Sequence, residues 1–217
     1  MLRSTATGVS LALMTMLASA QTTDTDNPGG LRPFIGVGYT FGGDTIQHVT
    51  LQPKGTTIEY QEDISAGGGL DLRVGLDYRF RGSPFSLQAS LAYHNDQVNG
   101  SDGERSFFVR VPVELVALYH FNPRGSVGLG VRKATHAKFS SRGGTCTYPD
   151  GSTEACPRID EKLNASTGII LEAEWAVTPS WGLKGRYVRE SFKFENDPTQ
   201  EKYEGDHVGL MSVFYFN

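Results

Sequence analysis

The chain has 217 residues, of which 38% are hydrophobic and 20% are charged. Its 20 basic and 24 acidic residues give a formal net charge of −4, which argues against a nucleic-acid-binding protein, because such proteins present basic surfaces to phosphate. The length allows one domain or two, and no run of about 18 apolar residues follows the first segment of the chain, so we expect no membrane-spanning helix.

Residues 1–20 are expected to be a cleaved secretory signal peptide. Arg3 precedes an apolar run that extends to Leu17, and the small residues 18–20 are of the kind that signal peptidase accepts. The alternative, a membrane anchor, is disfavoured because the run is short and contains Thr and Ser. Export leaves residues 21–217 as a single mature domain.

Eight segments of the mature chain alternate apolar and polar residues with a period of two, which is the period of a β-strand. In residues 67–80 the apolar side chains take the even positions, and charged side chains share the odd positions with glycines. Each segment is long enough to cross a bilayer as a tilted strand. In chain order they are 32–41, 67–80, 84–94, 106–121, 126–134, 167–177, 180–190 and 207–216.

The connections between these segments alternate in length. The short ones are 81–83, 122–125 and 178–180, and the long ones are 42–65, 94–104, 137–163 and 192–206. Outer-membrane barrels have short periplasmic turns, long extracellular loops and periplasmic termini. The sequence therefore predicts an all-β fold, an eight-stranded antiparallel up-and-down transmembrane β-barrel, over the soluble β-sandwich that alternation alone also allows.

Aromatic residues lie near both ends of the predicted strands. Those near the short connections are Phe80, Phe85, Phe121, Trp181 and Phe216, and those near the long connections are Tyr39, Phe41, Tyr93 and Phe107. We therefore expect two aromatic girdles, one at each membrane interface.

Pro112 lies in the middle of the segment 106–121. Proline cannot donate a ladder hydrogen bond, and a closed barrel has no edge strand in which to place it. We therefore expect a β-bulge in this strand.

The polar faces of the strands are expected to line the lumen. Eight strands enclose a space just wide enough for side chains to fill, and charges in so narrow a space are costly unless they are paired. The predicted inward acids and bases are equal in number. We expect an ion-pair network made by Asp71, Arg73, Asp77, Arg79, Arg110, Glu114, Arg132, Glu172, Glu174, Lys184, Arg186 and Glu190.

The two cysteines, Cys146 and Cys156, are expected to form a disulfide, because an exported protein meets an oxidising compartment. The loop that they close is short, so in the chain-entropy model the bond contributes about 2 to 3 kcal/mol. It lies in the long connection 137–163, outside the barrel. No further His or Cys lies close enough in sequence to predict a metal site there.

Four stretches of the chain carry a resemblance to a known class of protein: GGDT (42–45), AGGGLDLRVGLDYRF (66–80), RVPVELVALYHF (110–121) and HVGLMSVFYF (207–216). They resemble small outer-membrane β-barrel proteins of Gram-negative bacteria, broadly the OmpA and OmpX kind, and a proteobacterial family of such barrels.

The resemblance implies a monomer in contact with outer-membrane lipids, including lipopolysaccharide, and a C-terminal strand that the barrel-assembly machinery reads. Barrels of this kind usually end in an aromatic residue. This chain departs from that pattern, because it ends in Phe216 and Asn217, and the alternation puts Phe216 on the lipid face.

Three functions fit such a barrel. We expect a non-enzymatic structural or surface-interaction protein with a plugged lumen, whose long loops contact an extracellular ligand. The first alternative is a small passive pore for ions or small solutes, although open aqueous channels typically have about 16 strands.

The second alternative is an enzyme that modifies outer-membrane lipid. His94, His136 with Ser140, and Asp206 with His207 are the residues to consider. None of them has a partner at a spacing that fixes a catalytic geometry. We therefore expect no catalytic residue, no metal and no cofactor.

Overall fold

The computed structural model describes residues 29–51, 60–100, 103–147, 152–199 and 201–216. The predicted signal peptide, residues 1–20, lies outside the described residues. Within the described part of the chain, no helix is long and apolar enough to cross a membrane.

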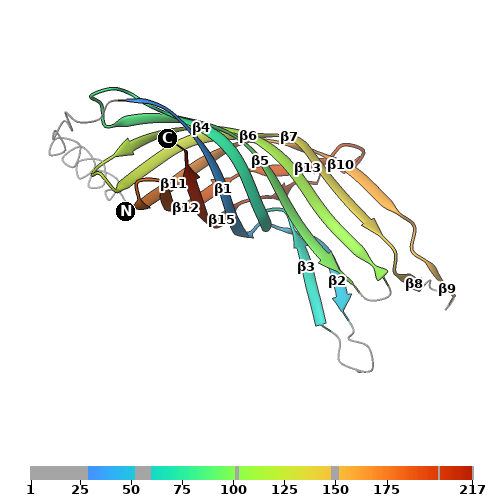
Figure 1. The fold of residues 1–217 in the computed structure, drawn as a ribbon. Helices are drawn as coiled ribbons and strands as arrows, with labels where there is room; N and C mark the ends of the chain where they lie inside the picture. Colours follow the sequence, from blue (N-terminus) through green and yellow to red (C-terminus); the bar gives the residue numbers. More distant parts are fainter. Residues whose placement is uncertain (1–28, 52–59, 101–102, 148–151, 200, 217) are drawn as a thin grey trace, which may run out of the picture.

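Eight long antiparallel strands close into a barrel (Figure 1). Each pairs with its neighbour, and closure is made by β15 against β1, where Tyr215 faces Phe34, and by β11 against β7, where Ile169 faces Val131. The fold predicted from the alternation is therefore confirmed. The strands are β1 (Gly30–Gly42), β4 (Gly69–Arg79), β5 (Phe85–Asn99), β6 (Arg105–His120), β7 (Gly125–Arg142), β11 (Thr167–Thr178), β12 (Trp181–Arg189) and β15 (His207–Tyr215).

The two ends of the barrel differ. Connections 80–84, 121–124 and 179–180 meet at one end, which we call the turn end, and the long connections meet at the other, the loop end. Strands β5, β6 and β7 have 15, 16 and 18 residues, whereas β12 and β15 have nine each. The three long strands extend beyond the others at the loop end (Figure 1).

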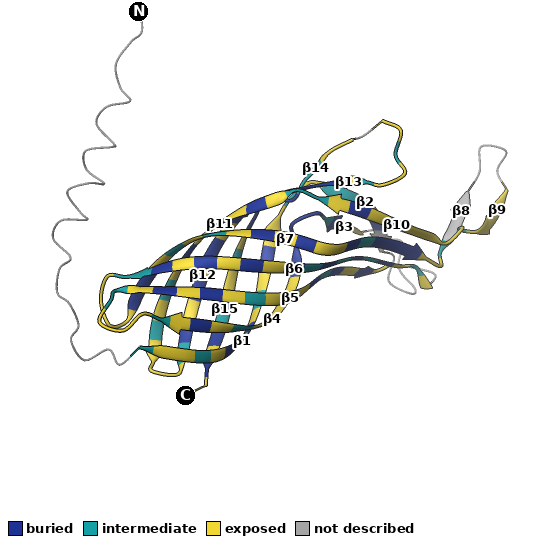
Figure 2. Cartoon of the chain, turned by 90° about the horizontal axis from the view of Figure 1, so that it is seen from above, coloured by how far each residue is buried: buried dark blue, intermediate teal, exposed yellow. Residues whose placement is uncertain are grey.

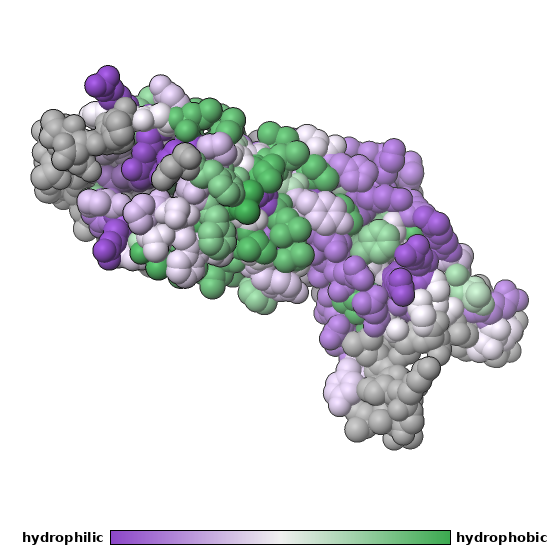
Figure 3. Space-filling model, viewed as in Figure 1, coloured by the Kyte–Doolittle hydropathy of each residue, from purple (hydrophilic) through white to green (hydrophobic). Residues whose placement is uncertain are grey.

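Side chains alternate between the outside of the barrel and its lumen, as the striped strands of Figure 2 show. In β4, Leu72 and Val74 are 42% and 56% exposed, whereas Asp71 and Arg73 are buried. Exposed hydrophobic side chains occur on all eight strands, and on the face seen in Figure 3 they form a hydrophobic belt, with hydrophilic residues toward the loop end. A continuous apolar surface of this kind is typical of contact with lipid.

Most of the predicted girdle aromatics lie on this outer surface. Phe80, Phe121 and Phe41, for example, are exposed. Trp181 differs, because it is only partly exposed and its ring stacks on Phe214 at 6.3 Å between ring centres. Its indole nitrogen donates a hydrogen bond of 2.6 Å to the Ser212 hydroxyl, and Ser212 and Phe214 both have the outward parity of β15, so the indole lies against the outer surface of that strand.

A β-bulge is present at Pro112, but the extra residue is on the neighbouring strand. Val111 pairs with His136 and Pro112 pairs with Ala134, which leaves Thr135 of β7 without a ladder partner on β6. The Thr135 hydroxyl donates a hydrogen bond of 2.9 Å to the Val111 carbonyl. The alternation of β6 continues unbroken, and the inward parity changes in β7, so placing the bulge in the strand of Pro112 was wrong.

The long connections fold into further strands at the loop end. They are β2 (Thr45–Leu51), β3 (Tyr60–Ser65), β8 (Thr145–Thr147), β9 (Thr153–Ala155), β10 (Ile159–Ala165), β13 (Ser191–Phe194) and β14 (Tyr203–Glu204). β2 pairs with β3, and β10 joins β7 to β13 and so to β14. We call β2, β3, β10, β13 and β14 the cap.

The cap has an apolar core that fills the loop end of the barrel. Phe108 and Phe192 are fully buried in it and meet edge to face at 5.2 Å between ring centres. Ile64 of β3, also fully buried, belongs to the same cluster. The buried members of this cap core are Val49, Ile64, Ala66, Val98, Phe108, Ala134, Ala137, Phe139, Leu163 and Phe192.

The two cysteines lie beside a small hairpin beyond the cap. Cys146 pairs through its backbone with Glu154, and Cys156 follows β9 directly. The side chain of Cys146 lies outside the described residues, so the disulfide between Cys146 and Cys156 stays a prediction.

Candidate functional site

The centre of the lumen is organised around Glu114 of β6. Its carboxylate contacts three guanidinium groups, those of Arg73, of Arg132 at 3.4 Å and of Arg186 at 2.7 Å. All four side chains are buried and come from four different strands, β4, β6, β7 and β12. Removing so many charges from water is costly unless each charge is compensated. Here the surrounding opposite charges compensate them.

Further ion pairs extend from this centre toward both ends. Arg73 binds Asp71 at 2.8 Å, and Arg186 lies 3.8 Å from Glu172, whose other partner is Lys184 at 2.6 Å. Together they form a connected lumen network. Its members are Asp71, Arg73, Glu114, Arg132, Glu172, Glu174, Lys184, Arg186 and Glu190.

Two neutral residues extend the lumen network toward the turn end. The Tyr215 hydroxyl donates to the Glu174 carboxylate at 2.7 Å, and Gln88 accepts from Lys184 at 2.8 Å while donating to Tyr215 at 3.1 Å. Both residues have the inward parity of their strands, and this parity identifies them in the sequence as lumen residues. The predicted network contains only charged side chains.

The lumen also contains apolar side chains, which the sequence analysis did not predict. Val116, Leu118, Ile170 and Val188 form one buried cluster. Phe34, Met211, Val213 and Tyr215 form another. These positions carry apolar residues on both faces of a strand, so alternation could not separate the inward side chains from the outward ones.

Three of the predicted network residues lie apart from it. Asp77 binds Arg32 at 3.0 Å, and Arg79 contacts the Nδ1 atom of His120 at 3.3 Å. Arg110 makes no ion pair with a described residue. It donates to the backbone carbonyls of Ala66 and Gly68. Arg110 was expected to join the ion-pair network, and its contacts with these carbonyls differ from that expectation.

Arg110 instead connects the lumen to the cap. Its guanidinium lies 4.8 Å from the ring centre of Phe108 and 5.9 Å from that of Phe192, both in the cap core. A guanidinium over an aromatic face is attracted by the ring quadrupole. The carbonyls that it binds belong to the segment between β3 and β4, so Arg110 holds this segment across the loop end of the lumen.

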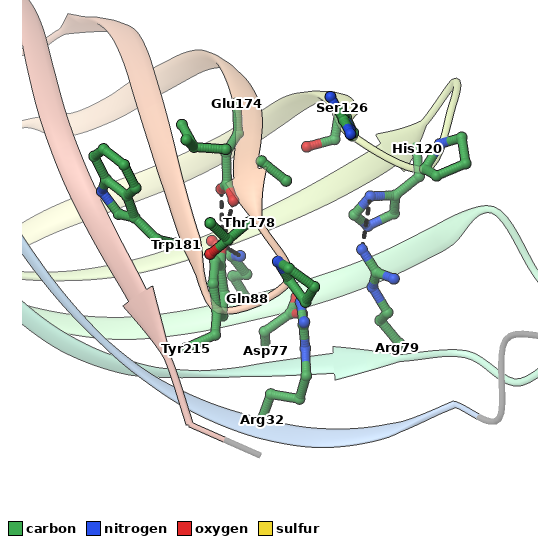
Figure 4. Close-up of a pocket in the computed structure, with 15 residues that line it drawn as sticks. Arg32, Asp77, Arg79, Gln88, His120, Ser126, Glu174, Thr178, Trp181 and Tyr215 are labelled. Atoms are coloured by element: carbon green, nitrogen blue, oxygen red, sulfur yellow. Dashed lines mark hydrogen bonds and ion pairs between the residues drawn. The ribbon is translucent and has the colours of Figure 1, made fainter.

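At the turn end the lumen opens into a cavity of about 350 Å³, which we call the vestibule (Figure 4). The side chains of Arg32, Asp77, Arg79, His120 and Tyr215 point into it. Glu174 closes its inner wall, where the lumen network begins.

Two histidines that are far apart in sequence meet near the loop end of the lumen. The rings of His94 and His207 lie 5.4 Å apart, and both are buried. Thr40 contacts the Nε2 atom of His94 at 2.7 Å. His94 Nδ1 has no hydrogen-bond partner among the described residues, so no acid orients this imidazole as a general base requires.

The other residues that we considered for catalysis are dispersed. Ser140 donates a hydrogen bond of 2.5 Å to Asp160, and Asp206 accepts one of 3.1 Å from the Tyr187 hydroxyl. His207 Nδ1 contacts the Gly205 carbonyl at 2.7 Å. Across the described residues, no group of three or more His, Cys, Asp or Glu side chains could hold a metal ion.

A family model described as "Outer membrane protein beta-barrel domain" matches residues 10–216, nearly the whole chain. The chain belongs to this family. The match agrees with the eight-stranded closure and the hydrophobic belt, and it places the protein among barrels of the bacterial outer membrane. A search of curated proteins gave no match.

Three solved structures illustrate the similarity of this outer-membrane barrel to other barrels. Ail, the attachment invasion locus protein of Yersinia pestis, solved in complex with the heparin analogue sucrose octasulfate, has 14% identity and a TM-score of 0.48, over 87% of this chain and 99% of that one. Neisserial surface protein A has 11% identity and a TM-score of 0.46, over 86% and 97%. The outer membrane protease OmpT from Escherichia coli has 12% identity and a TM-score of 0.35, over 89% and 95%.

Proposed function

We propose that this protein is a closed, non-enzymatic outer-membrane barrel, plugged by the lumen network, whose folded cap contacts ligands outside the cell. The lumen network carries the proposal. Glu114 of β6 joins arginines from β4 and β12, so ion pairs reach across the lumen between strands that are not neighbours in the sheet.

A second barrier lies in series with the network. The cap core fills the loop end with apolar side chains, and Phe108, Ile64 and Phe192 are fully buried there. A solute would have to displace both the ion pairs and this apolar core. Buried ion pairs that lose one partner are strongly destabilised, so transient opening of the network is costly.

The lengths of the connections support an orientation with the turn end and both termini in the periplasm and the cap outside the cell. In this orientation the hydrophobic belt contacts outer-membrane lipids, with lipopolysaccharide around the cap. The last strand, which ends at Tyr215 in the structure, is the segment offered to the barrel-assembly machinery. The protein acts as a monomer in this proposal.

The cap supports a role in surface contact because it is a folded platform. Asp160 of β10 binds Lys138 of β7 at 2.8 Å and accepts hydrogen bonds from Ser140 and Arg158. Such ties fix the outer edge of the sheet, and binding residues are often carried by segments that a rigid scaffold positions.

Planar-bilayer recording of the refolded mature protein tests this proposal. We expect no steady conductance from the wild type, with folding verified by the different gel positions of boiled and unboiled samples. A stable, well-defined channel would contradict the plug and favour the passive pore. Hydrolysis of lipopolysaccharide or phospholipid by the wild type would favour the enzyme instead.

A further inference from the structure

The vestibule is separate from the plug and has its own chemistry. Its volume of about 350 Å³ lies within the range of small-molecule sites, roughly 300 to 1,000 Å³. It is lined by the polar side chains of Arg32, Arg79 and His120 and by the aromatic ring of Tyr215 (Figure 4). Of these side chains, only Tyr215 also contacts the lumen network, through Glu174.

The two carboxylates that line the vestibule are already neutralised. Asp77 binds the Arg32 guanidinium at 3.0 Å, and Arg32 also lies over the Tyr215 ring at 4.5 Å. Glu174 accepts from the Tyr215 hydroxyl and lies 3.3 Å from Lys184. Each of the two carboxylates therefore has a cation within 3.3 Å.

Arg79 is the cation that remains. Among the described residues, no carboxylate lies within 4.0 Å of its guanidinium. Its partner is the Nδ1 atom of the His120 imidazole at 3.3 Å, and its Nε atom is buried with no described hydrogen-bond partner. His120 is held in turn by the Ser86 hydroxyl at 2.9 Å, so the Arg79 head group is fixed while most of its donors stay unused.

We propose that the vestibule binds a small oxyanion, a carboxylate or a phosphate, on the guanidinium of Arg79. A guanidinium offers a planar fork of donors that matches both groups, and charge-assisted hydrogen bonds of this type are strong. Arg124 also lines the cavity and adds positive charge there. The Tyr215 ring provides an aromatic wall for the carbon skeleton of a carboxylate ligand.

Trp181 lies at the edge of the cavity, so its fluorescence is used to follow binding there. The chain has two tryptophans, and the other, Trp175, is 50% exposed on the outer surface of the barrel. In a Trp175→Phe background, the fluorescence of Trp181 alone is recorded while sodium phosphate or sodium succinate is added at constant ionic strength, with chloride as the replaced anion. Calorimetric titration gives an independent measure of the same affinity.

We expect saturable binding of at least one of the two probes, and an affinity loss of about tenfold or more in Arg79→Gln, because the charge-assisted bonds are lost. Arg79→Lys keeps the charge without the fork and should give an intermediate affinity. Arg81→Gln is the matched control, because Arg81 is exposed in the adjacent turn and does not line the cavity. Boiled and unboiled gel positions show that each variant is folded.

The source of the anion is distinguished by repeating the titration in vesicles. Phosphate affinity that falls when phosphatidylglycerol is added to phosphatidylcholine assigns the site to lipid headgroups, and unchanged affinity assigns it to dissolved anions. The proposal is overturned if neither probe binds at millimolar concentration, or if folded Arg79→Gln binds as the wild type does. Neither result depends on whether the lumen conducts.

Discussion

The carboxylate of Glu114 and the guanidinium of Arg186 lie 2.7 Å apart, although β6 and β12, which carry them, are not neighbours in the sheet. The contact therefore spans the lumen. Arg186 also lies 4.0 Å from Asp71 of β4, so this arginine connects β12 to both β4 and β6. These ion pairs thus connect opposite walls of the barrel through its interior.

Removing the Glu114 carboxylate should destabilise the barrel strongly. In Glu114→Ala, three guanidinium groups lose their shared partner, and an uncompensated buried charge costs about 3 to 5 kcal/mol. Urea unfolding of the refolded protein in lipid vesicles measures the loss. Leu115→Ala is the control, because the neighbouring Leu115 side chain is 47% exposed on the outer surface and should cost less. Equal effects of the two substitutions would contradict the inward placement of Glu114.

The Tyr215 hydroxyl should contribute measurably to stability. Tyr215→Phe removes its hydrogen bonds to Glu174 and Gln88 and should cost about 1 to 3 kcal/mol, because buried polar partners are then left unsatisfied. The same urea unfolding measures it. Tyr78→Phe serves as the control, since Tyr78 is 48% exposed on the outer surface. A loss in Tyr78→Phe as large as that in Tyr215→Phe would contradict the prediction.

Phe192→Ala should loosen the cap and leave the barrel folded. Phe192 is fully buried in the cap core, where truncation of a phenylalanine typically costs about 3 to 5 kcal/mol. We expect faster proteolysis of the connection 192–206, with the shift between boiled and unboiled gel positions retained. Phe216→Ala, at an exposed position, should not change proteolysis of the cap. Loss of the folded barrel in Phe192→Ala would show that cap and barrel fold as one unit.

Thiol labelling tests the disulfide. Cys146 and Cys156 should resist labelling in the unreduced, unfolded protein and react after reduction. Cys156→Ser should leave the barrel folded, because β8 and β9 pair only with each other in the sheet. Labelling of the unreduced chain would contradict the bond, and loss of the barrel in Cys156→Ser would contradict its placement outside the barrel.

The contacts of Asp160 should persist in mild acid. Hydrogen bonds from Lys138, Ser140 and Arg158 hold the pKa of Asp160 below its usual value. A carboxylate with a lowered pKa in the folded state stabilises above its unfolded pKa, about 3.9, and this contribution is lost only as the pH falls through the lower, folded value. NMR titration of the Asp160 carboxyl should show no protonation between pH 7 and about pH 4. A midpoint at or above its ordinary value would contradict these contacts, and Asp160→Asn supplies the assignment.

The barrel could be predicted from the sequence because the alternation of apolar and polar residues indicates whether each side chain faces the lipid or the lumen. The predicted segment 67–80 became β4 with Asp71 and Arg73 inside. The bulge was harder to place, because Pro112 marks where the ladder fails and not which strand takes the extra residue. Thr135 has no sequence feature that distinguishes it from its neighbours.

The cap and the vestibule could not be predicted, because both are made by long-range contacts. Ile64 and Phe192 meet in one cluster, although each lies in or beside a connection that we expected to be a loop. The pairing of Arg32 with Asp77 likewise depends on the register of β1 against β4, which alternation does not determine. A polar residue of inward parity can be identified in advance, whereas its partner cannot.

Because the strands differ in length, the rim at the loop end of the barrel is higher on one side than on the other. At about 3.3 Å per residue, the 18 residues of β7 extend roughly twice as far as the nine of β12. A large molecule that approaches over the β12 and β15 side meets a low rim, while the wall of β5, β6 and β7 blocks the opposite side. Approach to this end of the protein is therefore directional, and a large partner would reach it from the β12 and β15 side rather than along the barrel axis.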